Sequence, residues 1–191
     1  MNYKILRVPP RDELGYLEQE TRGVAQAWRL GDGEPMGDKF PKQASYPLSK
    51  KHRGMKLTDF IPNKFSRLII SEKARKLLET APVDIEWLPI SIIDKKDRVV
   101  DAPYSIAHVL GTVDCVDLER SEYDRSSFSP EQFLVIRRLL LREDKIPEQS
   151  SLFRIKEYPR AFIIREDLLD KLTAAGVTGL DVLELGAPVM L

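Results

Sequence analysis

The sequence predicts an α+β fold with a mixed or mainly antiparallel sheet and a few packed helices. Short runs rich in β-branched and aromatic residues recur along the chain, for example LIIS, EWLPISII and AFII. Isolated helical patterns interrupt these runs, with no regular alternation of strand and helix. The 191 residues are 42% hydrophobic and 31% charged, which is enough for one domain with a sizeable core.

The first 64 residues combine one strand with an extended region. Residues 3–8 (YKILRV) form a strand pattern that two prolines end. Residues 31–64 are rich in Gly, Pro, Lys and Ser, and we expect them to be loop that wraps the core without elements of its own. The chain is therefore expected to divide into residues 1–64 and an α+β core of residues 65–191, within one compact domain overall.

The core opens with a strand followed by a helix. Residues 68–70 form a short buried strand, and Ser71 is a good N-cap for the next segment. We expect a helix over residues 72–81, ended by Pro82. Its apolar face repeats at helical spacing in Ala74, Leu77, Leu78 and Ala81.

Strand patterns continue beyond this helix. Residues 84–93 form one strand pattern, and a turn follows at residues 94–97. Residues 99–113 form a second strand region, which is broken. Residues 129–132 (SPEQ) have the form of a capping box with Pro at the first helical position. We expect a short helical turn there, followed by a strand over residues 137–142.

The C-terminal part resembles the first strand–helix unit. After a short strand at residues 152–155, we expect a strand over 161–164, a helix over 166–175 and a last strand over 180–185. Gly176 is placed as the left-handed residue that ends the helix. The likeness between the two units follows from shared strand–helix–strand physics and does not establish a duplication.

Charge is balanced overall but not along the chain. Net charge is zero, so no global field favours nucleic acid or membrane, and we expect neither as a direct partner. Residues 39–80 carry 11 Lys/Arg against 3 Asp/Glu, and residues 81–131 carry 5 against 11. The basic and acidic blocks either face each other or are solvated separately.

The sequence offers no catalytic constellation. A single cysteine, Cys115, excludes an intrachain disulfide, and no signal-peptide or membrane-spanning pattern is present, so we expect a cytoplasmic protein. His52 and His108 have no neighbour at metal-ligand spacing, and no phosphate-binding glycine motif occurs. We therefore expect no enzymatic activity, no cofactor and no metal.

The densest polar feature is an acidic segment at residues 114–124, which contains five carboxylates. Three interpretations apply to it: a solvated turn, a site for a basic protein partner, or a divalent-metal site. The carboxylates do not share one face of either a helix or a strand. The metal site is therefore the least favoured of the three.

This acidic region also carries a family resemblance. Residues 113–124 (VDCVDLERSEYD) resemble the signature of a family of immunity proteins from bacterial polymorphic-toxin systems, formerly a domain of unknown function. Leu118 stands where that signature usually has an aromatic residue, and Arg120 replaces a lysine. The matching positions are Asp114, Cys115, Asp117 and Ser121.

Three flanking segments resemble the same family in the same order, so that the resemblance covers residues 65–185 and leaves residues 1–64 uncovered. In the last of them Arg165 stands where Ser is common, which weakens the helix N-cap. The segments are LIISEKARKLLE at 68–79, LFRI at 152–155 and AFIIREDLLDKLTAAGVTGLDV at 161–182.

The resemblance implies an immunity protein that binds and neutralises a cognate protein toxin acting in the cytoplasm. Two alternatives stay open: an adaptor or structural partner in a secretion-type assembly, and a metal-dependent enzyme that uses the carboxylates of residues 114–124. For contact with the toxin we select five residues of the acidic segment, namely Asp114, Asp117, Glu119, Ser121 and Glu122.

Overall fold

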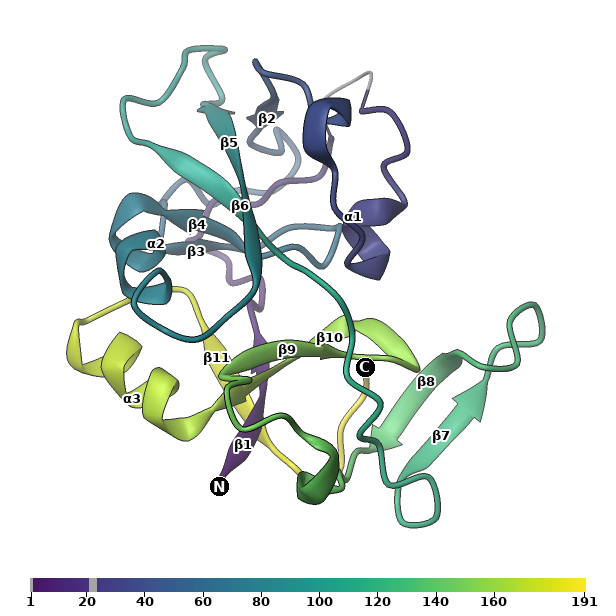
Figure 1. Ribbon diagram of the computed structural model, residues 1–191. Coiled ribbons are helices and arrows are strands. Elements are labelled where there is room, and N and C mark those ends of the chain that lie inside the picture. The colour runs from purple at the N-terminus through teal and green to yellow at the C-terminus, as the bar shows by residue number, and fades with distance from the viewer. Residues whose placement is uncertain (1, 21–23) are drawn as a thin grey trace.

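The computed structural model describes residues 2–20 and 24–191, and the α+β class is confirmed (Figure 1). Two 3₁₀ turns, at Gly37–Lys39 and Glu143–Lys145, accompany the longer elements. In chain order these are β1 (Tyr3–Arg7), α1 (Arg29–Asp32), β2 (Ser45–Pro47), β3 (Phe60–Ile61), β4 (Ile69–Ser71), α2 (Glu72–Leu78), β5 (Ile85–Ile93), β6 (Tyr104–Val109), β7 (Glu122–Arg125), β8 (Phe133–Arg138), β9 (Leu152–Ile155), β10 (Tyr158–Arg165), α3 (Glu166–Ala174) and β11 (Asp181–Glu184).

The strands form two sheets and a separate hairpin. The five-stranded sheet has the order β2-β5-β6-β4-β3, and the four-stranded sheet has the order β11-β1-β10-β9. All pairings are antiparallel except that between β2 and β5. Figure 1 shows the two sheets one above the other with α2 and α3 on the same side, and β7–β8 projecting from the opposite side.

Both faces of each sheet are buried, because successive strand residues point to opposite sides. Ile70 of β4 and Ile164 of β10 point into a central core between the sheets, where α2 and α3 also pack. Ile69 points the other way, into a core that we call the N-terminal core. Ile163 points into a third core beneath the four-stranded sheet, against the β7–β8 hairpin. This double burial explains why these strands are continuous apolar runs.

The expectation that residues 31–64 contain no elements of their own is wrong. They contain the second half of α1, a 3₁₀ turn, β2 and β3. The stretch supplies buried side chains such as Met36, Tyr46 and Ile61 to the N-terminal core. Apart from the adjacent Phe60 and Ile61, its large apolar residues stand singly among polar residues, Gly and Pro, so no helical or strand period shows in the sequence.

The helical turn expected at residues 129–132 is also wrong. The backbone N–H of Gln132 donates to the Ser129 carbonyl at 2.8 Å, which closes a turn, and β8 begins at once at Phe133 instead of at residue 137. The Phe133 N–H then donates to the Glu157 carbonyl at 2.7 Å. A contact with the distant β9–β10 turn thus replaces the local hydrogen bond that would have continued a helix.

The two strand–helix units were placed correctly, although each helix is shorter than expected. The Ser71 hydroxyl accepts from the Ala74 N–H at 3.3 Å, as predicted for an N-cap, and it also donates to Asp59 at 2.6 Å. Burial acts to raise the pKa of Asp59, but the hydrogen bonds from Ser71 and Thr178 lower it. Gly176 ends α3 with φ of +64°, in the left-handed region.

Among the described residues, no helix has the length and apolar character that crossing a membrane would require.

Candidate protein interface

The acidic segment lies in the connection from β6 to the β7–β8 hairpin, and its last residues, 122–124, belong to β7. Its beginning is anchored by burial, because the Cys115 side chain is fully enclosed in the third core and Val116 packs beside it. The Cys115 carbonyl accepts from the Arg142 N–H at 2.7 Å. The segment is therefore fixed against the chain that leaves β8.

Asp117 and Ser121 hold the turn in the acidic segment against Leu140. The Asp117 N–H donates to the Leu140 carbonyl at 2.9 Å. The Ser121 hydroxyl accepts from the Leu140 N–H at 2.9 Å and donates to the Leu140 carbonyl at 3.2 Å. The two polar residues that matched the family signature here thus satisfy backbone groups that a loop would otherwise leave unpaired.

Most carboxylates of the segment pair with nearby cations. Asp114 lies 2.9 Å from the ammonium of Lys156, and that hydrogen bond holds the pKa of Asp114 below its usual value. Asp117 lies 3.7 Å from Arg120, Glu122 pairs with Arg138, and Asp124 pairs with Arg137. Among the described residues, the Glu119 side chain has no ion pair, and it is exposed.

The two charge blocks are joined by few direct contacts. Lys50 of the basic block pairs with Asp97 of the acidic block at 2.9 Å. The ion pairs within the basic block are local, as in the pair of Arg75 and Glu79 at 2.8 Å. Since residues 114–124 find their cations within residues 120–156, their charge is not directed at the basic block.

The β7–β8 hairpin presents apolar side chains to solvent. Three of the seven exposed large hydrophobic residues in the described part of the chain lie on it or on the adjoining turn: Phe128 is 97% exposed, Leu134 62% and Leu118 42%. Between its two strands Tyr123 stacks on Phe133 with ring centroids 4.0 Å apart, and the Arg125 guanidinium lies over both rings. The stack ties β7 to β8 near the hairpin loop.

A hollow of about 240 Å³ lies between this hairpin and the body of the molecule. Glu157, in the turn between β9 and β10, lies in its wall and is buried. The hollow is lined from α1 by Asp32, from the hairpin by Gln132 and Leu134, and from β10 by Tyr158 and Arg160. It could accept a side chain that has an apolar stem and a polar end.

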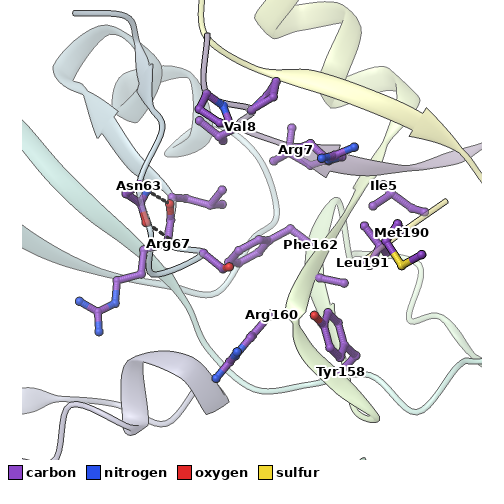
Figure 2. Close-up of a pocket in the computed structure, with 16 residues that line it drawn as sticks. Ile5, Arg7, Val8, Asn63, Arg67, Tyr158, Arg160, Phe162, Met190 and Leu191 are labelled. Carbon is purple, nitrogen blue, oxygen red and sulfur yellow. Dashed lines mark hydrogen bonds between the residues drawn. The ribbon is translucent and has the colours of Figure 1, made fainter. Parts of the chain in front are cut away.

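A second groove, of about 250 Å³, lies where β1 and β10 meet residues 63–68 (Figure 2). Figure 2 shows the Asn63 amide bonded to the Arg67 backbone, while the Arg67 guanidinium points away from Phe162. That guanidinium pairs instead with Glu20 at 2.5 Å and donates to the Tyr46 hydroxyl at 3.1 Å. The groove is lined by polar and apolar groups in equal measure.

The residues with nucleophile or base chemistry are placed for packing. Burial raises the pKa of the Cys115 thiol to about 12, which keeps the thiol protonated. The His108 ring is fully buried and lies 2.7 Å from the Glu34 carbonyl, and burial lowers its pKa. Within the described ranges no three His, Cys, Asp or Glu side chains gather in a way that would hold a metal ion.

Comparison with known families gives one match. Residues 7–187 match the family model described as Immunity protein family (Imm11). The recognition made from the sequence motifs is thereby confirmed, and the match also takes in most of residues 1–64, which the motifs left uncovered. No curated protein matches the chain.

Proposed function

The chain belongs to the immunity protein family Imm11, and from this membership we propose that it binds and neutralises a cognate protein toxin. It does so by forming a complex, without catalytic turnover. The toxin acts in the cytoplasm, where this protein meets it. The burial of Cys115 and His108 supports the proposal, because neither side chain is presented to a substrate.

The surface that meets the toxin is the β7–β8 hairpin together with the turn at residues 117–121. One observation carries this assignment: Phe128, at the far end of the hairpin, leaves 97% of its side chain in water. A projecting aromatic residue has a large apolar area to gain on binding, and aromatic residues dominate the energetics of protein interfaces. Leu118 and Leu134 extend the apolar area along the hairpin.

The acidic residues selected from the sequence divide into two roles at this surface. Asp117 and Ser121 hold the turn in shape through Leu140. Asp114 ties it to the body through its ion pair with Lys156, and Glu122 pairs with Arg138 within the hairpin. Glu119 remains exposed and meets a basic group on the toxin. Toxins that attack nucleic acids need basic surfaces, which an acidic partner attracts.

Replacing Phe128 with Ala tests the assignment. The toxin is the product of the neighbouring gene, prepared as an inactive variant, and its Kd is measured by titration calorimetry. Loss of a central aromatic contact should weaken binding by about 30-fold or more. The melting temperature should not change, since Phe128 has almost no contacts in the free protein.

Val99→Ala is the matched control, because Val99 is 66% exposed but lies outside the hairpin and its adjoining turn. Its effect on the Kd should be small. If the Phe128→Ala protein binds as tightly as the control, the interface lies elsewhere. If the unmodified protein itself binds no toxin and gives no protection to cells that express it, the proposed function is wrong.

Replacing Glu119 with Lys should slow association with the toxin and reduce its dependence on salt. Exposed charges at an interface act mainly on the rate of encounter. Stopped-flow association at several salt concentrations measures both effects, with Asp101→Lys as the control at an exposed site outside the acidic segment. Because Glu119 has no ion pair among the described residues, its reversal should leave stability nearly unchanged. Equal association rates for the Glu119→Lys and Asp101→Lys proteins would show that Glu119 does not contact the toxin.

A further inference from the structure

Glu157 occupies an unusual position for a carboxylate. It lies in the two-residue turn that joins β9 to β10, and turn residues are normally exposed. Its exposed fraction is only 8%. The start of β8 covers it, as the hydrogen bond from the Phe133 N–H to the Glu157 carbonyl demonstrates.

One oxygen of this carboxylate, Oε2, is buried without a hydrogen-bond partner among the described residues. The nearest basic neighbour in sequence, Lys156, is committed to Asp114 at 2.9 Å. Burial raises the pKa of Glu157, and the negative charge of Asp114 acts in the same direction. The backbone N–H of Glu157 and the charges of Lys156 and Arg125 offset this rise in part. A buried acceptor that is left unpaired lowers stability, so its presence calls for an explanation outside the fold.

The hollow beside the hairpin provides that explanation. Glu157 lines it together with a second carboxylate, Asp32, at the end of α1. The apolar parts of its wall come from Phe133, Leu134 and Tyr158. Two carboxylates and apolar walls in one hollow match the cationic head and aliphatic stem of a lysine or arginine.

From this arrangement we propose that the hollow receives a lysine or arginine side chain of the toxin, which pairs with Glu157 and Asp32 when the toxin docks on the hairpin. The inference rests on the proposed function and deepens it, because it specifies a contact within that interface. The hollow and the exposed face of the hairpin share Leu134, so one partner can cover both.

Cations of the protein itself are the competitors. The charges of Lys156 and Arg125 act on Glu157. Arg160 also lines the hollow, and it is exposed with no ion pair among the described residues. If Arg160 turned inward onto Glu157, the carboxylate would be satisfied within the fold. In that case Glu157→Gln and Arg160→Gln would each lower the melting temperature and leave the toxin affinity unchanged.

The experiment compares Glu157→Gln with unmodified protein for binding to the inactive toxin. The substitution keeps the shape of the side chain and removes its charge. We expect the Kd to rise by about 30-fold or more, mainly through faster dissociation, as for a desolvated charge contact. The melting temperature should stay constant or rise, because an unpaired buried charge has been removed.

Two further variants complete the design. Asp32→Asn, at an exposed position, should weaken binding by about threefold. If the Glu157→Gln protein does not fold, the Kd of the Asp32→Asn protein in the same assay tests whether the hollow receives a cation of the toxin. Asp170→Asn, at an exposed position on α3, is the control. If the toxin binds unmodified protein and these variants equally, the inference fails while the proposed function stands. If unmodified protein binds no toxin, the proposed function itself fails.

Discussion

We propose that residues 1–64 and 65–191 form a single folding unit. Residues 65–191 are therefore expected not to fold when residues 1–64 are removed. β1 is an inner strand of the four-stranded sheet, with β10 on one side and β11 on the other. Its removal leaves β11 without a neighbouring strand. It also breaks the central and third cores, to which Leu6 and Ile5 contribute.

Removal of residues 1–64 takes still more buried side chains from the N-terminal core. Eight of its fourteen buried residues lie within residues 17–61, and without them one face of the five-stranded sheet is exposed to water. Burial of a large apolar side chain contributes about 1.5–3 kcal/mol. Losing several such contributions exceeds the total stability of an ordinary domain, about 5–15 kcal/mol.

Circular dichroism and amide NMR spectra of the truncated chain measure the effect. We expect no cooperative thermal transition and poorly dispersed amide resonances. Adding a separate polypeptide of residues 1–64 should restore dispersion at least in part, since it supplies the missing strand. A cooperative transition in residues 65–191 alone would contradict the prediction and would make the N-terminal part an appendage.

Replacing Arg154 with Met is expected to lower the free energy of unfolding by about 4 kcal/mol or more. Arg154 is 2% exposed and forms no ion pair within 4.0 Å in the described part of the chain, although the charge of Asp32 acts on it. Its guanidinium instead donates to four backbone carbonyls, and it lies 4.5 Å from the Phe162 ring centre. The accepting carbonyls are those of Val109 at 2.8 Å, Pro159 at 2.6 Å, Leu30 at 3.2 Å and Gly31 at 3.3 Å.

These carbonyls come from distant parts of the fold. Leu30 and Gly31 belong to α1, Val109 to β6 and Pro159 to β10, so Arg154 joins the N-terminal segment to both sheets. Methionine at position 154 keeps much of the volume of the side chain but leaves the four carbonyl oxygens without a donor. A lysine there could not reproduce the planar set of N–H donors of the guanidinium. Burial lowers the pKa of Arg154 to about 10, which leaves it charged at neutral pH.

Urea unfolding followed by tryptophan fluorescence gives the free energy of unfolding for each variant. Arg160→Met is the matched control, because Arg160 lies on the next strand, is exposed and has no ion pair among the described residues. Its effect should stay within about 0.5 kcal/mol. A similarly small effect for Arg154→Met would show that the four carbonyls are satisfied without the guanidinium.

The acidic segment shows which features of the candidate interface can be predicted from neighbouring residues and which cannot. The motif VDCVDLERSEYD identified the family, because a family signature is a property of consecutive residues. The partners of its side chains were not predictable. Ser121 contacts Leu140 and Asp114 contacts Lys156, and such pairs depend on where β8 and β9 return in space.

Patterns among neighbouring residues were enough to predict the α+β class, the strand–helix units around Ser71 and Gly176, and the family to which the chain belongs. These features depend on capping, on left-handed backbone and on apolar runs, which act between residues close in sequence. Only the tertiary structure decided that residues 31–64 build a core, that residues 129–132 form a hairpin turn, and that Glu157 is buried. Each of these depends on contacts between segments far apart in the chain, as when Phe133 meets the turn at Glu157 and β1 pairs with β10. Such contacts leave no period in the sequence, because their stabilisation exists only after the whole chain has closed around its cores.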